Sequence, residues 1–216
     1  MSGLLKRIIR DVPLYAPVRA WRVKSRLNKD LLRWEKAGRP APSPHLVKQQ
    51  ALIEYARLYD LKILVESGTY YGDMVNAMMG EFDRVYSIEL SPKLFEKARR
   101  RFRHAPNVEL IQGDSGEVMA GLVDSLTEAT LFWLDGHYSG DDTAKGVLET
   151  PIYEELRHIL DAPKIGHVVL IDDARLFGTD PAYPTLEELR AFVHERRPDL
   201  ELVARNDSIR ITPRID

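Results

Sequence analysis

From Lys62 onward, short apolar runs rich in β-branched residues alternate with segments of helical character. The runs lie at residues 63–65, 85–88, 108–111, 131–134 and 168–171, and helices are predicted near 73–79, 92–102, 116–126 and 151–160. Apolar strands that lack an inside–outside alternation and are separated by helices indicate a parallel sheet covered on both faces. The pattern predicts an α/β protein with a doubly wound sheet.

Capping signals and the last apolar runs complete this prediction. Ser91 is followed by proline at the first position of a predicted helix, and residues 185–188 have the pattern of a capping box. Residues 200–204 and 209–211 then predict a closing hairpin. We therefore expect seven strands.

The N-terminal residues form a basic arm. Residues 1–40 contain 11 Lys or Arg and 3 Asp or Glu, whereas the remainder contains 20 basic and 30 acidic residues. Helical spacing of apolar residues predicts two short helices, interrupted at Pro13 and Pro17, and the Pro-rich segment 39–44 predicts a stiff linker.

The domain organisation follows from this arm and linker. We expect a helical arm with its linker over residues 1–44 and one α/β domain over residues 45–216. Ser43 is predicted to cap the first helix of that domain. The buried face of this helix is expected to carry Val47, Ala51, Tyr55 and Leu58.

Composition excludes several classes of protein. The chain has no cysteine, which removes disulfides, thiolate catalysis and zinc–thiolate sites and is compatible with a reducing cytoplasm. No apolar run approaches the roughly 18 residues that span a bilayer, and the N-terminal residues lack the apolar core of a signal peptide. We expect a cytoplasmic protein.

Acidic residues follow the predicted strands one after another. They are Glu66, Glu89, Asp114, Asp135 and the pair Asp172 and Asp173, after the first to fifth strands respectively. Ligands of an open parallel sheet bind outside the carboxyl ends of its strands. One such acid has an ordinary explanation, because Asp is frequent at turns and caps. Acids at five successive strand ends predict a crevice lined with carboxylates.

The segment Glu66-Ser-Gly68-Thr-Tyr-Tyr-Gly72 only partly matches the dinucleotide fingerprint. That fingerprint needs a middle glycine for close approach to a diphosphate, and Tyr70 stands in that neighbourhood. A negative Glu66 would repel a diphosphate but suits a cofactor with an ammonium and a sulfonium group. Gly68 permits close backbone approach, and Gly72 is expected to let the next helix pack against the strand.

Two further acids have the spacing of cofactor ligands. Glu89 lies 21 residues after Gly68, the spacing at which an acid after the second strand reaches ribose hydroxyls. Asp114 and Ser115 follow the third strand and are placed to bond an adenine amino group. Ser115 can equally be the N-cap of the next helix.

Residues from about 45 to 213 resemble the class I S-adenosylmethionine (SAM)-dependent methyltransferases, through the glutamate–glycine segment, Glu89 and Asp114 in that order. The resemblance implies a seven-stranded Rossmann-like sheet with its last strand antiparallel, and SAM as the cofactor. It implies cofactor contacts at Glu66, Gly68, Thr69, Tyr70, Gly72, Glu89, Asp114, Ser115 and Asp135. The chain departs from the pattern at Tyr70 and Tyr71, where many members carry further glycine.

Asp135, Asp172 and Asp173 also predict a metal site. Adjacent strand ends lie ~5 Å apart, so the three carboxylates can converge. Without a partner they would repel one another, and a divalent cation such as Mg²⁺ would balance them. In the alternative interpretation, Asp135 binds only the cofactor and Asp173 caps a turn before Arg175.

The segment Trp133-Leu-Asp135-Gly-His137-Tyr is similar to small metal-dependent O-methyltransferases, most of all the macrocin-type enzymes that methylate sugar hydroxyls. The resemblance implies a catalytic base two or three residues after the first metal ligand. His137 occupies that neighbourhood, so Asp135 and His137 are the candidate catalytic residues. An ordinary hydrogen-bonding role for His137 in the loop stays open.

The sequence thus predicts a SAM-dependent O-methyltransferase that acts on a small-molecule or sugar hydroxyl with help from a divalent metal. Two alternatives stay open: a metal-free methyltransferase for another acceptor, and a cofactor-binding module without turnover. A nucleic-acid acceptor is not expected, because the domain is acidic and has no Asn-Pro-Pro-Tyr-type element.

The basic arm suits three roles. It can cover the acceptor pocket as a lid, join two subunits of a homo-oligomer, or place residues 1–38 peripherally on an anionic membrane. The opposite charges of arm and domain favour the first two roles.

Overall fold

The computed structural model describes residues 15–135, 151–163 and 165–214. Its centre is a seven-stranded sheet of order β3-β2-β1-β4-β5-β7-β6. The strands are β1 (Ile63–Ser67), β2 (Arg84–Glu89), β3 (Val108–Gln112), β4 (Thr130–Leu134), β5 (Val168–Ile171), β6 (Leu200–Arg205) and β7 (Ser208–Pro213). The first five strands of the chain pair with one another in parallel, whereas β7 is antiparallel to both of its neighbours, β5 and β6. The predicted Rossmann-like sheet with an antiparallel last strand is confirmed.

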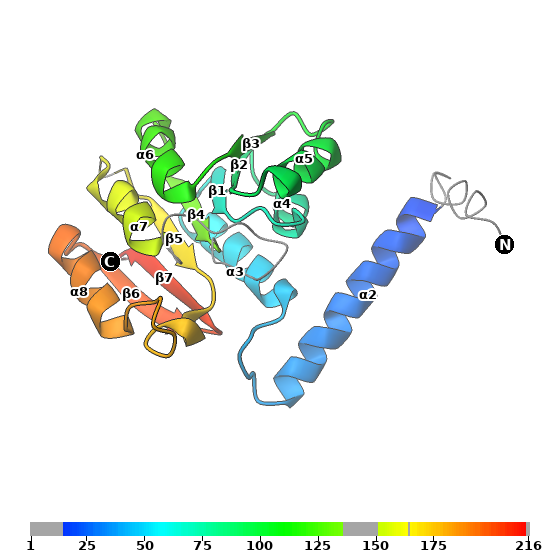
Figure 1. Ribbon diagram of the computed structural model, residues 1–216. Helices are drawn as coiled ribbons and strands as arrows, with labels where there is room; N and C mark the ends of the chain where they lie inside the picture. Colours follow the sequence, from blue (N-terminus) through cyan, green and yellow to red (C-terminus); the bar gives the residue numbers. More distant parts are fainter. Residues whose placement is uncertain (1–14, 136–150, 164, 215–216) are drawn as a thin grey trace.

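Helices cover both faces of the sheet (Figure 1). They are α2 (Tyr15–Lys36), α3 (His45–Leu58), α4 (Asp73–Met78), α5 (Pro92–Arg101), α6 (Ser115–Ser125), α7 (Ile152–Asp161) and α8 (Leu186–Arg196), with a 3-10 helix η1 (Ala174–Leu176). Helices α3, α4 and α5 pack against one face, and α6, α7 and α8 pack against the other. This is the layering expected of parallel strands joined by helical crossovers.

The alternation of side chains along each strand divides the core into two halves. In β4, Leu131 and Trp133 contact the half formed with α3 and α4, whereas Phe132 and Leu134 contact the half formed with α6 and α7. All four side chains are buried. Because both faces are covered, β4 after Thr130 and the whole of β5 are apolar, which makes these strands recognisable in the sequence.

Most predicted caps are present. The Ser91 hydroxyl accepts a hydrogen bond from the Leu94 N–H, and the capping box of Thr185 and Glu188 is complete. Ser43 is different: Pro44 is the N-cap of α3 and makes no side-chain cap bond. The Ser43 hydroxyl instead donates a 2.6 Å hydrogen bond to the Asn206 carbonyl and so joins the linker to the β6–β7 turn.

The buried face of α3 also differs from the prediction. Its buried residues are Val47, Ala51, Leu52 and Ala56. Leu58 is 56% exposed, because α3 ends there and Leu61 fills the core after the turn. The buried stripe is therefore rotated toward Leu52, which alters the side chains that α3 presents to the sheet.

Helix α2 extends away from the domain (Figure 1). It begins at Tyr15, before Pro17, so Pro17 does not interrupt it. Proline is tolerated there because the first turn of a helix has no N–H partners to lose. Trp34 is buried near α3, and its indole N–H donates a 2.6 Å hydrogen bond to the Pro40 carbonyl. The apolar residues 4–9 of the arm lie outside the described residues.

None of the helices in the described part of the chain has an apolar stretch long enough to cross a bilayer.

Candidate cofactor and metal site

The carboxyl ends of four neighbouring strands present acids to the same face of the sheet. Glu66 follows Leu64 by two positions and Asp135 follows Trp133 by two, and both apolar residues belong to the core half beneath α3 and α4. Side chains two residues apart on a strand share a face. Glu89 in β2 and Asp172 after β5 continue the same alternation. The fold thus gathers acids on the side that α3 and α4 cover.

Glu66 lies within β1 and does not follow it as predicted. The strand continues to Ser67 because its ladders continue on both sides, pairing Glu66 with Ser87 and with Trp133. Only 2% of Glu66 is exposed. Its Oε2 accepts a 2.5 Å hydrogen bond from the Ser87 hydroxyl, which lies 2.6 Å from the Thr69 hydroxyl.

The protonation of Glu66 follows from this burial. Burial, with a smaller effect of the charges of Asp135 and Glu89, raises the pKa of Glu66 to about 8, while the hydrogen bond from Ser87 opposes the shift. The carboxyl group is therefore largely neutral at pH 7. A cationic group bound beside it would favour its ionised form.

The turn after β1 brings its backbone to the neighbouring strand. The N–H groups of Gly68 and Thr69 donate to the Ile88 carbonyl at 3.0 and 3.1 Å, and the Gly72 N–H donates to the Thr69 carbonyl at 2.7 Å. Tyr70 has a φ of 50°, in the left-handed region that glycine enters more easily than tyrosine. The tyrosine is held there by the contact of its N–H with Glu89.

Gly72 is required by a different contact from the one predicted. A Cβ at this position would lie 2.5 Å from Cε2 of Phe102, and the φ of Gly72 is 75°. Phe102 is the C-cap of α5, so its ring packs over the turn. Gly72 therefore makes room for an aromatic ring at the end of α5. The sequence had predicted instead that Gly72 lets α4 pack against the strand.

Glu89 is held in place by two backbone groups. Its Oε2 accepts from the Tyr70 N–H at 2.7 Å, and its Oε1 accepts from the Ser91 N–H at 2.8 Å. Burial raises its pKa, and the two hydrogen bonds oppose this. Each carboxylate oxygen retains acceptor capacity, because a carboxylate has about four lone-pair positions. The bonds therefore orient the carboxylate and leave it able to accept from a ligand.

Asp114 and Ser115 lie where β3 passes into α6. Asp114 is the N-cap, and its Oδ1 accepts a 3.0 Å hydrogen bond from the Gly116 N–H. Ser115 is the first residue of α6 and does not take the cap role that the sequence also allowed. Both contacts with adenine stay predictions.

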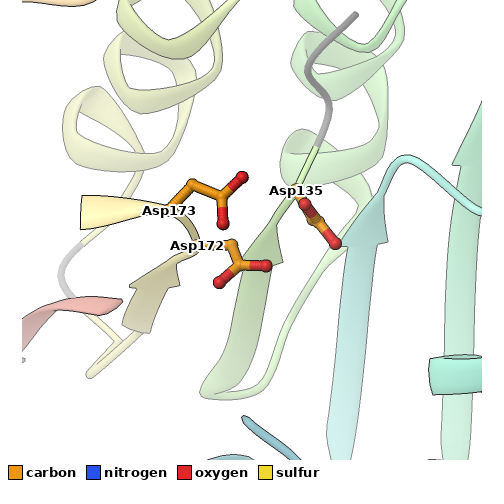
Figure 2. Close-up of side chains that lie close together, drawn as sticks. All are labelled: Asp135, Asp172 and Asp173. Atoms are coloured by element: carbon orange, nitrogen blue, oxygen red, sulfur yellow. The ribbon is translucent and has the colours of Figure 1, made fainter. Parts of the chain in front are cut away.

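Asp135, Asp172 and Asp173 converge as predicted (Figure 2). One ligand oxygen from each of the three lies within 4.8 Å of the others. Asp172 and Asp173 are both buried. The left-handed conformation of Asp173, with a φ of 56°, allows two consecutive carboxylates to lie near one point. Asp172 Oδ1 is buried and has no hydrogen-bond partner among the described residues.

Lys48 of α3 belongs to this cluster, although the sequence had not indicated it. Its ammonium forms an ion pair with Asp172 Oδ2 and lies 3.8 Å from Asp173 Oδ1. Burial and the charge of Asp135 raise the pKa of Asp172 to about 7, while the charge of Lys48 lowers it. A usable sequence signal was the helical spacing of Lys48 and Leu52, which places the lysine in line with a fully buried residue.

His45 lies one turn before Lys48 and was also missed. It is half-buried, and burial lowers its pKa, against the raising effect of Asp73 and Asp135. Its Nδ1 lies 2.6 Å from Gln49 Nε2. The first turn of α3 therefore places a lysine and a histidine beside the acids of the sheet.

Asp173 has a second partner. The Arg175 guanidinium donates to Asp173 Oδ1 and to Asp207 Oδ2, both at 2.5 Å. Asp173 precedes η1 but makes no side-chain cap bond there. Asp173 thus holds the N-cap position that the alternative interpretation gave it, with its carbonyl accepting from the Leu176 N–H at 2.8 Å and without a side-chain cap bond. His137, the candidate base, lies outside the described residues.

Comparison with known proteins gives structural matches only. No protein-family model matches the chain, and no curated protein matches it in sequence. The O-methyltransferase TomG from Streptomyces achromogenes, in complex with SAM, is 20% identical with a TM-score of 0.55, over 87% of this chain and 89% of that chain. An O-methyltransferase from Bacillus cereus, in complex with SAH, is 15% identical with a TM-score of 0.57, over 87% and 90%.

A third match is the SAH-bound methyltransferase PaMTH1 from Podospora anserina. It is 18% identical with a TM-score of 0.57, over 91% of this chain and 96% of that chain. The sheet of this protein is thus the seven-stranded Rossmann-like sheet of methyltransferases. At these identities the likeness concerns the fold.

Proposed function

We propose that this protein is a SAM-dependent methyltransferase. The observation that carries the proposal is the pair of Glu66 and Glu89, which lie buried on neighbouring strands at the carboxyl edge of the sheet. A neutral but ionisable carboxyl group suits a cationic cofactor, and a carboxylate oriented by backbone N–H groups suits two ribose hydroxyls. Three structural neighbours with the same fold have SAM or SAH bound in their structures, and the match covers most of the length of each.

The proposed cofactor residues come from the first four parallel strand ends. They are Glu66, Gly68, Thr69, Tyr70, Gly72, Glu89, Asp114, Ser115 and Asp135. Glu89 would accept from the ribose, Asp114 and Ser115 would bond the adenine amino group, and Glu66 with Asp135 would face the positive end of the cofactor. The alignment of methyl donor and acceptor can supply up to about 7–11 kcal/mol of the rate enhancement.

A divalent cation such as Mg²⁺ fits Asp135, Asp172 and Asp173. The three supply the oxygen ligands that hard cations take, and Asp172 Oδ1 is a buried acceptor in need of a partner. When bound, such a cation would supply charge stabilisation to an oxygen that loses its proton. We propose an O-methyltransferase that acts on a small-molecule or sugar hydroxyl. His137 would take the proton of that hydroxyl.

We further propose that the basic arm contacts a second copy of the chain. Helix α2 stands away from its own domain, carries Leu32 at 56% exposure, and belongs to a basic arm that is joined to an acidic domain. A lid over its own site would need the helix to lie against the domain. Association with an anionic membrane is the competing role, and a cytoplasmic location suits both.

Calorimetric titration with SAM, SAH and NAD tests the function. We expect binding of SAM and SAH but not of NAD, and Glu89→Ala should weaken SAM binding by about 1–3 kcal/mol, as for a hydrogen bond to a charged group. Glu109→Ala, an exposed acid on the next strand, is the matched control and should bind normally. Tight NAD binding without a response to SAM would exclude the proposed class.

Turnover is tested separately with labelled SAM and small-molecule extracts. Transfer of label to a hydroxyl compound supports the O-methyltransferase, and transfer to nitrogen or carbon supports another acceptor. Binding of SAM with no transfer to any acceptor would identify a cofactor-binding module.

A further inference from the structure

Lys48 occupies an electrostatically unusual position for a lysine. It lies in the first turn of α3, where no acidic residue is present. The N-terminal end of a helix is positive, so a cation there is destabilising unless another group offsets it. Asp172 and Asp173 from the end of β5 provide that compensation. Burial lowers the pKa of Lys48, but the charges of Asp172, Asp135 and Asp173 raise it by more, so that the net shift is upward. The side chain is therefore an ammonium.

The ammonium lies within the acidic cluster. It forms an ion pair with Asp172 and lies 3.8 Å from Asp173, and only 17% of the lysine side chain is exposed. A metal bridging the three carboxylates would have to lie among oxygens that are within 4.8 Å of one another. An ammonium and a dication in so small a space repel each other strongly.

The side chain of Lys48 is able to leave. Its charged group is carried on a flexible four-carbon stem, unlike the planar guanidinium of arginine. Arg175, a second cation beside the cluster in the described part of the chain, donates to Asp173 and Asp207 together, and is held by both. Of these two cations, Lys48 is the one whose departure would free oxygens of Asp172.

We propose that Lys48 is a built-in counter-cation of the acidic cluster and competes with a divalent metal for the same carboxylates. The inference rests on the proposed metal-assisted function. In the absence of metal, Lys48 neutralises part of the charge of Asp172 and Asp173 and keeps the site folded. A metal binds by displacing the ammonium, so Lys48 sets the metal concentration at which the site fills.

Metal binding by purified full-length protein tests the competition directly. Mn²⁺ titrations followed by calorimetry and by electron paramagnetic resonance should show that Lys48→Met binds Mn²⁺ at least about tenfold more tightly than the wild type, because a nearby positive charge is removed. Lys48→Arg retains the charge and should bind no more tightly than the wild type. Lys62→Met is the matched control, since Lys62 is exposed at the other end of β1, and should be unchanged.

Lysine modification gives a second measurement. Brief acetylation followed by mass spectrometry should show Lys48 protected in metal-free protein and labelled when saturating Mg²⁺ is added, with Lys62 labelled equally in both. Thermal unfolding checks that the variants fold: Lys48→Met should melt lower without metal and gain more from Mn²⁺ than the wild type.

Two outcomes would overturn the inference. Weaker Mn²⁺ binding by Lys48→Met would mean that Lys48 supports the metal site by holding Asp172. Unchanged binding, or no binding by any variant, would mean that no competition exists. SAM titration of the same samples separates these failures from a failure of the proposed function, because Glu66 and Glu89, which carry the cofactor proposal, do not belong to the cluster.

Discussion

The Ser87 hydroxyl donates a 2.5 Å hydrogen bond to Glu66 Oε2, across the ladder that joins β1 to β2. Burial keeps the pKa of this carboxyl group at about 8 despite the hydrogen bond. Glu66 is thus a mostly neutral acid at pH 7, placed where the positive end of the proposed cofactor would bind. The following two predictions depend on this relationship.

SAM binding should release a proton near pH 7. A bound cation favours ionised Glu66, so its pKa falls on binding, and affinity should rise with pH until about pH 8 and then level off. Calorimetry at pH 7 in buffers of different ionisation enthalpy measures the proton released. Glu66→Gln should remove both the proton release and this rise in affinity. Binding without proton exchange in the wild type would contradict the role given to Glu66.

The free energy of unfolding should also depend on Glu66. Because burial raises the folded-state pKa from 4.5 to about 8, the folded state holds this proton more tightly than the unfolded chain. Its contribution is fully present below pH 4.5 and is lost as pH rises through about 8. Glu66→Gln should therefore gain stability relative to the wild type, from near zero at about pH 4 to at most about 5 kcal/mol at about pH 9. Urea unfolding at both pH values measures the difference, with Glu109→Gln as the exposed control.

Gly72→Ala should destabilise the fold through Phe102. The added Cβ would lie 2.5 Å from the ring, and the φ of 75° is unfavourable for alanine. We expect a loss of about 1–3 kcal/mol, the usual cost of overpacking combined with a left-handed backbone. Gly80→Ala is the matched control, because a Cβ there meets nothing within 4 Å. Equal stability of the two variants in urea would show that the turn moves aside without cost.

Asp172→Asn and Asp173→Asn should each remove most methyl transfer while the protein stays folded. Either change removes a charged ligand of the proposed metal, and an excess of chelator should have the same effect on the wild type. Label transfer from SAM measures the activity, and circular dichroism verifies the fold. Full activity in excess chelator would remove the metal from the mechanism and leave the cofactor assignment intact.

Deletion of the arm should affect assembly more than cofactor binding. Removing residues 1–24 keeps Trp34 of α2 in its buried position near α3. This variant should no longer form the proposed homo-oligomer, as measured by sedimentation, and its affinity for SAM should be unchanged. Removing residues 1–38 also removes Trp34 and should in addition lower acceptor turnover, because α3 carries Lys48 and His45. If the 1–24 deletion keeps its assembly state and only the intact chain floats with anionic vesicles, the arm is a membrane contact.

The fold was predictable because its determinants are local or periodic. Five apolar runs separated by helical segments specify a parallel sheet covered by helices, and caps such as Ser91 and the box at Thr185 mark helix starts. The convergence of Asp135, Asp172 and Asp173 was predictable for the same reason, since parallel strands place their carboxyl ends at one edge. The sequence could not place Ser43, because its partner Asn206 is far along the chain.

By itself the sequence determined that an acidic residue lies at the end of each of the first five strands, and that these strands form a parallel sheet. Only the tertiary structure decided which helix covers them, because the face that α3 turns toward the sheet depends on how Leu52 packs and on where the helix ends. That packing brings Lys48 to Asp172 and Asp173, and it buries Glu66 deeply enough to raise its pKa to about 8. Desolvation and ion pairing depend on neighbours from distant segments, and the spacing that puts Lys48 in line with Leu52 does not identify those neighbours.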